Sequence, residues 1–304
     1  MGLGVDEMSE KIIRNDVPMM EMGITPGSAC QGCGAALASR LAFKALGPNA
    51  VRLLIPCCPD TTTNHPMSIG VFEGGGAHLS GLARGLKAQG RSDVIAVGLF
   101  GDGGTYDIGF QGLSAAAERN ENILVLTKDN EAYMNTGAQR SGGTPKYAIT
   151  STNFVGPKSR GKAMHKKKIP QIFAAHGVPY VATASIAFPE DLIAKVNYAK
   201  SITGFRMVIM QSPCPVGWRY DPAKSIEVAR AGVQSGVWPL YEVLDGEDFK
   251  LNYKPRELKP VTEYLKSQGR FRHMTEEEIG DIQNYTTSRW ELLEKADELK
   301  KLIM

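Results

Sequence analysis

The sequence predicts a doubly wound α/β fold built on a mostly parallel sheet, and three observations support this prediction. Continuous apolar runs, typical of strands that are buried on both faces, recur at 94–100 and 123–127. Stretches with apolar residues at helical spacing lie between these runs. Several runs end directly in glycine-rich or Asp-Asn turns, as at 101–104. Strands and helices that alternate in this way form a parallel sheet with helices on both faces.

The strand–helix alternation continues to residue 218, after an N-terminal stretch at 1–26 that we expect to be an irregular arm. Apolar spacing predicts a first helix over 34–46, which stops before Gly47-Pro48. A short apolar run predicts a strand at 51–56. By the same criteria, the later helices are expected at 74–87, 108–119, 169–176 and 189–202, and the later strands at 94–100, 123–127, 180–184 and 205–211.

The pattern changes after Trp218. Residues 219–270 contain several prolines and show little periodicity, so we expect an extended C-terminal tail that wraps a neighbour. Thr275 and the acidic residues after it predict the start of a terminal helix that runs to about Lys301. The predicted organisation is an α/β domain at 1–218 and a C-terminal extension at 219–304 that packs on partner subunits.

The composition is that of an ordinary globular protein. The chain has 304 residues, of which 42% are hydrophobic and 22% are charged, and its net charge is +3. This charge is too small to indicate nucleic acid or a membrane surface as a partner, and we expect the short basic cluster at 166–168 to be a solvated loop. No stretch reaches the roughly 20 apolar residues of a membrane helix and no secretory signal is recognised, so we expect a cytoplasmic protein.

Two motifs at predicted strand ends indicate a site for Mg²⁺ and a diphosphate. Gly101-Asp102-Gly103-Gly104 follows one strand and Asp129-Asn130 follows another, and ligands of open parallel sheets bind at such ends. Mg²⁺ prefers oxygen ligands in octahedral geometry, and Asp102, Asn130 and the Ala132 carbonyl could supply three of them. The glycines would let a diphosphate approach the backbone, towards a helix expected to start near Thr105. A simple Gly-Asp-Gly turn is the alternative, but the pairing of two motifs favours the cofactor site.

The five cysteines form a second set of candidate ligands. In a reducing compartment, metal binding or catalysis is a better interpretation of these cysteines than disulfide bonds. Cys30 and Cys33 share a glycine-rich loop, Cys57 and Cys58 follow a predicted strand, and Cys214 lies at another strand end. Four thiolates suit either Zn²⁺ or a [4Fe–4S] cluster, and inert thiols remain a third alternative.

These motifs together resemble those of one enzyme family. The chain is similar to the beta subunits of 2-oxoacid:ferredoxin oxidoreductases, and in particular to those of pyruvate:ferredoxin oxidoreductases, which use thiamine diphosphate. The resemblance covers nearly the whole chain, and the stretches that carry it are 28–35, 101–109, 129–137, 179–185, 212–218 and 264–271.

The resemblance implies a thiamine-diphosphate-binding fold and a role for each motif. The Mg²⁺ ion would be held by Asp102, Asn130 and the carbonyl of Ala132. Asn135 would reach the substrate and the reactive face of thiamine. The residues that the resemblance places around the diphosphate and thiamine are Gly101, Asp102, Gly103, Gly104, Asn130, Ala132, Tyr133 and Asn135. The [4Fe–4S] ligands would be Cys30, Cys33, Cys58 and Cys214, which leaves Cys57 outside the cluster.

The implied activity is the oxidative decarboxylation of a 2-oxoacid in anaerobic metabolism. Pyruvate would give acetyl-CoA and CO₂, with coenzyme A as co-substrate and ferredoxin as electron acceptor. Subunits of the alpha, gamma and delta types would complete a hetero-oligomer, and the alpha type would supply the carboxylate-binding and thiamine-activating groups.

The substrate remains open in the sequence. The stretches 59–66 and 139–145 depart from the common pyruvate-type pattern, so oxalate, phenylglyoxylate, a branched-chain 2-oxoacid and 2-oxoglutarate are alternatives. A non-redox thiamine decarboxylase or carboligase subunit, or a non-catalytic scaffold, would be a different class of protein. Structural roles are expected for His65, His78 and Glu131, and core or interface roles for the tryptophans.

Overall fold

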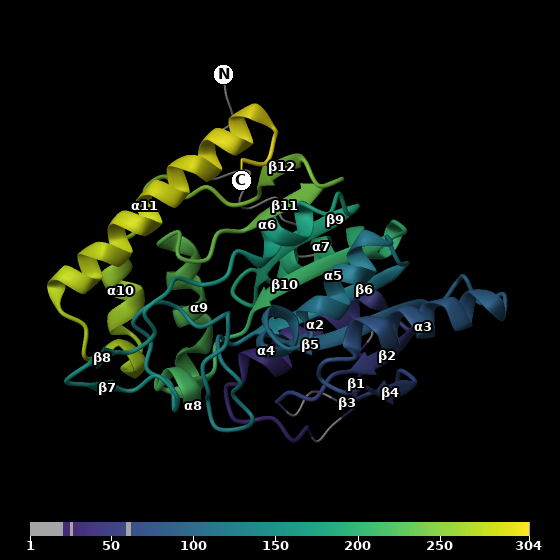
Figure 1. Cartoon of the computed structure of the whole chain (residues 1–304), viewed down its shortest axis with the longest axis horizontal. Coiled ribbons are helices and arrows are strands. Elements are labelled where there is room, and N and C mark those ends of the chain that lie inside the picture. Colours follow the sequence, from purple (N-terminus) through teal and green to yellow (C-terminus); the bar gives the residue numbers. More distant parts are fainter. Residues whose placement is uncertain (1–20, 25–26, 59–61, 304) are drawn as a thin grey trace.

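A central eight-stranded sheet organises the molecule, as Figure 1 shows for this computed structural model, which describes residues 21–24, 27–58 and 62–303. The strand order is β12-β11-β9-β10-β6-β5-β2-β4. The six strands from β9 to β4 in this order are all parallel to one another. They are β9 (Tyr180–Ser185), β10 (Phe205–Gln211), β6 (Ile123–Asp129), β5 (Ile95–Gly101), β2 (Ala50–Leu54) and β4 (Met67–Ile69).

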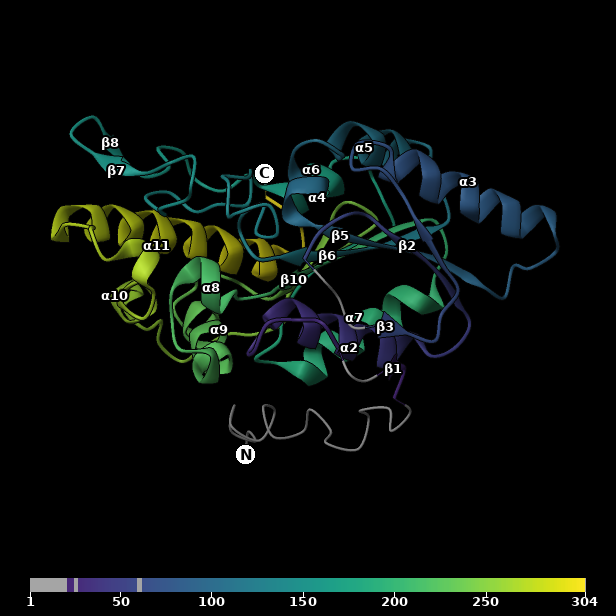
Figure 2. The same cartoon turned by 90° about the horizontal axis from the view of Figure 1, so that it is seen from below.

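Helices cover both faces of the sheet, as Figure 2 shows. One face carries α2 (Gly34–Leu46) and α7 (Pro189–Ser201). The other carries α3 (Gly75–Ala88), α5 (Phe110–Glu118) and α6 (Ile169–Ala174). This arrangement confirms the predicted doubly wound α/β fold. Two short antiparallel pairs lie outside the main sheet, namely β1 (Gly23–Ile24) with β3 (Thr62–Thr63) and β7 (Val155–Gly156) with β8 (Ser159–Arg160).

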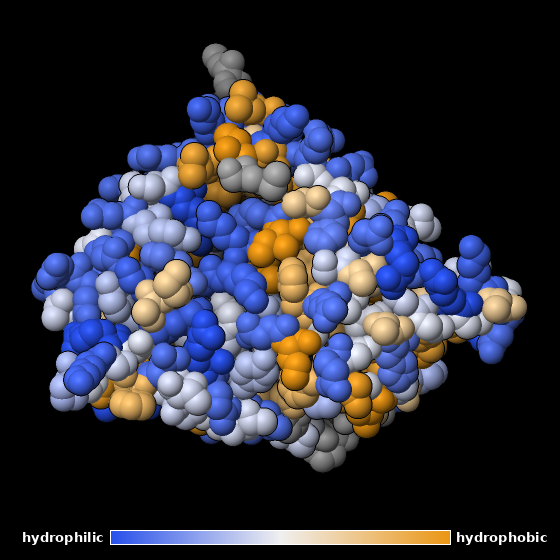
Figure 3. Space-filling model, in the orientation of Figure 1, coloured by the Kyte–Doolittle hydropathy of each residue, from blue (hydrophilic) through white to orange (hydrophobic). Residues whose placement is uncertain are grey.

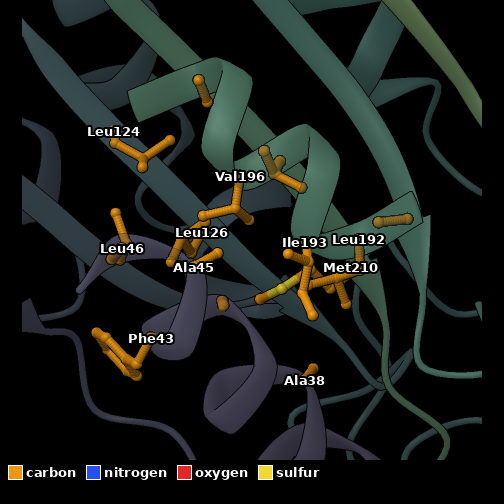
Figure 4. Close-up of a cluster of buried hydrophobic side chains, with 14 of the residues drawn as sticks. Ala38, Phe43, Ala45, Leu46, Leu124, Leu126, Leu192, Ile193, Val196 and Met210 are labelled. Atoms are coloured by element: carbon orange, nitrogen blue, oxygen red, sulfur yellow. The ribbon is translucent and has the colours of Figure 1, made fainter. Parts of the chain in front are cut away.

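The central strands are apolar without alternation because both of their faces are buried. In β6, Leu124 and Leu126 pack under α2 and α7, whereas Ile123 and Val125 pack under the opposite helix layer. Figure 4 shows side chains of α2 and α7 that meet Leu124, Leu126 and Met210 of the sheet. The apolar runs in the sequence are continuous because each central strand contributes side chains to two cores, one on each side of the sheet.

One helix begins earlier than expected. We expected a helix at 108–119 with its start near Thr105, but a short helix α4 (Asp102–Tyr106) begins directly after β5, and α5 follows it. The junction between the two helices is tight, since a Cβ atom at Gly109 would lie 2.2 Å from the carbonyl oxygen of Gly104. Gly103 and Gly104, which we expected in a turn after the strand, therefore lie in a short helix at the end of β5.

The expectation of an extended tail at 219–270 was wrong. This stretch contains the 3₁₀ turn η1 (Pro222–Lys224) and the helices α9 (Ser225–Gln234) and α10 (Val261–Lys266). It also contains the hairpin β11 (Tyr241–Leu244) and β12 (Asp248–Leu251), which extends the sheet antiparallel to β9. The prolines misled the prediction because they lie in turns and at helix starts, as at Pro222 and Pro260, and leave the short elements intact. Packing of 219–304 on partner subunits stays a prediction.

The terminal helix was predicted correctly. α11 (Glu276–Leu299) begins with a capping box in which the Thr275 hydroxyl accepts from the Glu278 backbone N–H and the Glu278 carboxylate accepts from the Thr275 N–H. No helix among the described residues is long and apolar enough to cross a membrane. Figure 3 shows that the face seen in Figure 1 is largely polar, with apolar residues in small separate groups, which is normal for a protein surface.

Gly76 is expected to be essential for the packing of α3 on α5. A Cβ atom at Gly76 would lie 2.3 Å from the carbonyl group of Gly112, so Gly76→Ala must push the helices apart. We expect it to destabilise the fold by about 1–3 kcal/mol, measured as a lower midpoint of thermal unfolding. Gly81→Ala is the control on the same helix, because nothing lies within 4 Å of its Cβ position, and it should stabilise by about 0.5–1 kcal/mol. Equal effects of the two substitutions would contradict this account.

Candidate active site

The two predicted motifs meet at the carboxyl edge of the sheet. β5 and β6 are parallel neighbours with Gly101 opposite Lys128, so the turns that follow them lie side by side. A cavity of about 100 Å³ opens between these turns. All the residues expected to contact the cofactor line it, namely Gly101, Asp102, Gly103, Gly104, Asn130, Ala132, Tyr133 and Asn135. The structure thus brings this set together, while its binding role stays a prediction.

Three candidate Mg²⁺ ligands meet at one point of this cavity. One end of the Asn130 side-chain amide lies 2.9 Å from Asp102 Oδ1 and 3.0 Å from the carbonyl oxygen of Ala132. With Mg–O distances of 2.0–2.1 Å, neighbouring ligands of an octahedral Mg²⁺ ion lie about 2.9 Å apart. The NH₂ group of the amide, turned towards these two oxygens, donates to both, whereas Mg²⁺ would require the amide oxygen there. The two distances match two edges of one face of a magnesium octahedron, so Asp102, Asn130 and Ala132 form a candidate oxygen cluster for Mg²⁺.

Asp102 is held on its other side by the segment 141–144. The Ser141 hydroxyl donates to Asp102 Oδ2, and the Gly143 N–H donates to Ser141 Oγ at 3.1 Å. Asp102 is buried, and this burial, together with the Asp129 carboxylate, raises its pKa well above its usual range. A cation beside Asp102 would stabilise its ionised form. Part of the 139–145 stretch thus supports the Asp102 carboxylate, a role that the sequence did not reveal.

Gly103 lets an aromatic ring pack against the turn that carries Asp102. A Cβ atom at Gly103 would lie 2.2 Å from the Tyr133 ring, and the Tyr133 hydroxyl donates to the Gly103 carbonyl at 3.2 Å. Tyr133 comes from the loop after β6, so this contact joins the two turns. Any side chain at Gly103 would separate them.

A second cavity, of about 470 Å³, gathers the four predicted cluster ligands. Its lining includes Cys30, Cys33, Cys58 and Cys214, whereas Cys57 lines the first cavity. The two cavities are adjacent, because they share the lining residues Cys58, Asn130, Met134 and Asn135. Within the described part of the chain, no three Cys, His, Asp or Glu side chains lie close enough together to hold a single metal ion. The cysteines therefore surround a space instead of converging on one point.

Close backbone contacts position these cysteines. Cys33 precedes α2, and its N–H donates to the Cys30 carbonyl at 3.1 Å in a tight turn. Gly34 donates to the carbonyl of Pro213 at 3.0 Å, and a Cβ atom there would lie 2.7 Å from Pro213. Cys214 caps the short helix α8 (Pro215–Trp218) by accepting from the Gly217 N–H. The glycine thus lets the loops of Cys33 and Cys214 meet.

The environment of Cys58 and Cys214 disfavours the thiolate form unless a metal is bound. Burial, reinforced by the nearby Cys214, raises the pKa of Cys58 to about 12. Burial also raises the pKa of Cys214. A thiol that coordinates a metal loses its proton to become a thiolate, so a bound metal would offset the effect of burial on Cys58 and Cys214.

Two lysines of the basic cluster at 166–168 are not solvated as we expected, whereas Lys168 is exposed. Lys166 Nζ lies 2.7 Å from Asp129 Oδ2 and 3.0 Å from Glu131 Oε1, and Lys167 donates to the carbonyl of Tyr106. Asp129 and Glu131 are buried, so they require cationic partners. These pairs could not be predicted, because the partners lie far apart along the chain.

The remaining expectations concern residues outside the cavities. His65 is buried, with its ring nitrogens near Thr63 Oγ1 and the Gly47 carbonyl, as expected of a structural histidine. The three tryptophans are buried as expected, and they are Trp218, Trp238 and Trp290. Residues 59–61, which include part of the divergent stretch after Cys58, lie outside the described residues.

Comparisons with known proteins agree with the resemblance seen in the sequence. The family model for the C-terminal TPP-binding domain of thiamine pyrophosphate enzymes matches residues 58–210. Pyruvate synthase subunit PorB of Methanothermobacter thermautotrophicus is 49% identical and covers 87% of this chain and 95% of that protein. Ketoisovalerate oxidoreductase subunit VorB of Pyrococcus furiosus is 42% identical over 94% of this chain and 96% of that protein.

A solved structure shares the fold. The 2-oxoglutarate:ferredoxin oxidoreductase from Magnetococcus marinus superposes with a TM-score of 0.54 at 21% identity. The match covers 72% of this chain and 81% of that chain. Sequence relatives and fold agree, and the chain therefore belongs to the thiamine-dependent beta subunits of the 2-oxoacid:ferredoxin oxidoreductases, the family that includes PorB and VorB.

Proposed function

We propose that this subunit binds thiamine diphosphate through Mg²⁺ and a [4Fe–4S] cluster in two adjacent cavities. The Mg²⁺ ligands would be Asp102, Asn130 and the Ala132 carbonyl. The cluster ligands would be the four cysteines of the second cavity, Cys30, Cys33, Cys58 and Cys214. The observation that carries the proposal is that the cavity with the oxygen cluster and the cysteine cavity are both lined by Asn130 and Cys58. A cofactor that releases electrons and a centre that accepts them would then be neighbours.

The spacing of the cysteines favours an iron–sulfur cluster over zinc. A structural Zn²⁺ ion needs four ligands at about 2.3 Å from one centre, which draws the sulfur atoms together. In the described chain the cysteines line a cavity of about 470 Å³ without such convergence. A polynuclear cluster held by four thiolates fills a space of this kind.

The residues that line the two cavities would have separate roles in the reaction. Thiamine diphosphate, when bound, supplies the electron sink for decarboxylation. Asp102, Asn130 and Ala132 would anchor the diphosphate through the cation, and Gly103 would keep the two turns together by admitting the Tyr133 ring. Asn135 lines both cavities and is our candidate for orienting the substrate by a hydrogen bond from its amide. Cys58 would hold the side of the cluster that faces the thiamine site.

Pyruvate is the substrate that we propose to test first. The PorB relatives match at 39–49% identity and the Pyrococcus VorB relatives at 40–42%, so the highest of these identities belong to pyruvate synthase subunits. The second candidate is a branched-chain 2-oxoacid, because the name of the VorB relatives indicates ketoisovalerate. The products from pyruvate would be acetyl-CoA and CO₂, with ferredoxin as the electron acceptor.

The subunit would act within a hetero-oligomer in the cytoplasm. The subunit names PorB and VorB imply complexes with further chains, for which the alpha, gamma and delta types are our proposal. The alpha type would bring the groups that bind the substrate carboxylate and activate thiamine. Isolated, this chain is expected to be inactive.

The test is viologen reduction by the native complex, purified without oxygen and assayed with pyruvate, ketoisovalerate, 2-oxoglutarate, phenylglyoxylate and oxalate. Activity with pyruvate that depends on coenzyme A, in a complex that contains thiamine, magnesium, iron and acid-labile sulfide, would support the proposal. Preference for another acid would change the proposed substrate but leave the proposed cofactors as they are. A complex without iron would refute the cluster, and a preparation without divalent cation that turns over at the full rate would refute the magnesium site.

A further inference from the structure

One arginine from the C-terminal part of the chain contacts Glu131, the residue between Asn130 and Ala132 of the oxygen cluster. Arg270 belongs to the 3₁₀ turn η2 (Gly269–Phe271), and only 1% of its surface is exposed. Its Nη2 atom lies 2.5 Å from Glu131 Oε2, although the two residues are 139 positions apart. Neither the mechanism nor the cofactor site described above uses this contact.

Glu131 is the residue between two of the three converging oxygens. Its φ angle is 67°, in the left-handed region, which costs a residue with a side chain roughly 1–2 kcal/mol. This conformation turns the chain between Asn130 and Ala132, where the side-chain amide of one and the carbonyl oxygen of the other lie 3.0 Å apart. Whatever holds Glu131 in place therefore holds the geometry of the oxygen cluster.

Arg270 also braces Asn130 through Trp218. The guanidinium carbon of Arg270 lies 3.9 Å from the centroid of the Trp218 ring, and Trp218 is fully buried. The Trp218 indole N–H donates to the Asn130 carbonyl at 2.8 Å. One planar guanidinium thus supports both Asn130 and Glu131.

The planar guanidinium suits these contacts better than an ammonium group would. Arg270 pairs with Glu131 through Nη2, donates from Nε to Gln268 Oε1 at 2.9 Å and stacks on Trp218. A lysine could keep the charge beside Glu131 but could not also stack and donate in that plane.

We infer that Arg270 is a positioning residue for the divalent cation: by pairing with Glu131 and stacking on Trp218, it fixes the turn from Asn130 to Ala132. The inference rests on the proposed function, in which that turn supplies two Mg²⁺ ligands. Arg270 sets the affinity of the complex for Mg²⁺, and through Mg²⁺ for thiamine diphosphate. The reaction itself does not involve the guanidinium.

The test compares Arg270→Gln and Arg270→Lys with the wild-type complex, by titrating Mg²⁺ into the cofactor-free complex in the presence of excess thiamine diphosphate. For Arg270→Gln we expect Mg²⁺ binding to weaken by about 10- to 100-fold, as when groups that orient metal ligands are removed. Turnover should recover to within a few-fold of wild type at saturating Mg²⁺, and the iron content and the electron paramagnetic resonance signal should not change. Arg270→Lys should restore part of the affinity.

Arg206→Gln is the matched control. Arg206 is also buried, and it donates to the carbonyls of Ile123 and Ile202 at the opposite edge of the sheet. This variant should unfold at a lower temperature but bind Mg²⁺ as the wild type does. An equal loss of Mg²⁺ affinity in both variants, or wild-type affinity in Arg270→Gln, would overturn the inference. If Arg270→Gln fails to assemble, wild-type affinity in Arg270→Lys would overturn it. A wild-type complex with no requirement for a divalent cation would instead remove the proposed function.

Discussion

Replacement of Asp102 by asparagine is expected to abolish thiamine diphosphate binding at millimolar Mg²⁺ and to lower turnover by at least about 10³-fold. Asp102 supplies the one carboxylate among the three converging oxygens, and Mg²⁺ depends on charged, hard ligands. Asparagine keeps the shape of the side chain, so a loss of cofactor binding and turnover would be due to the missing negative charge. The acceptor for the Ser141 hydroxyl would remain as an amide oxygen in one orientation, which should limit the damage to the fold.

Bound thiamine diphosphate and Mg²⁺, measured after gel filtration of the intact complex, would check this prediction. Asp191→Asn is the control for loss of a poorly exposed carboxylate, because Asp191 pairs with Lys195 at 2.7 Å on α7. The control should lower the unfolding temperature without loss of cofactor. If Asp102→Asn retained both cofactor and activity, the oxygen cluster would not be the metal site.

Local motifs explain why most of the site could be predicted. The strand at 94–100 and the turn at 101–104 are contiguous in sequence, so the position of Asp102 at a strand end follows from the apolar run before it. The helix at 34–46 was predicted at its observed bounds because its apolar spacing and the terminating Gly47 are local signals. The family resemblance then named roles that spacing alone left open.

What could not be predicted depends on contacts between distant segments. Lys166 read as part of a basic surface cluster, and only the folded chain brings it to Asp129 and Glu131. Ser141 is an ordinary loop serine until it meets Asp102. Arg270 lay in a matching stretch of the C-terminal part, but no pattern in the sequence indicates its ion pair with Glu131. The contacts that support the candidate site are long-range, whereas its candidate ligands lie on short motifs.

The neighbouring residues Cys57 and Cys58 allow a test of the cluster in which each serves as the control for the other. Cys58→Ser should remove iron and acid-labile sulfide from the chain, or leave an incomplete cluster, and lower viologen reduction by at least about 100-fold. The reason is that a serine oxygen is a hard ligand and a poor substitute for a thiolate on iron. Cys57→Ser should keep a full cluster, because Cys57 lines the first cavity and Cys58 lines both.

Iron and sulfide analysis with low-temperature electron paramagnetic resonance of the two reduced complexes would decide this. The two substitutions are chemically identical and one residue apart, so a general loss of folding would affect both alike. Loss of the cluster in Cys57→Ser but not in Cys58→Ser would exchange the roles of the two residues. Retention of iron in both would place the fourth ligand elsewhere, and zinc in the wild-type complex would end the cluster proposal. Selective loss in Cys58→Ser would connect the second cavity to the electron path, because Cys58 lines both this cavity and the one that contains Asp102.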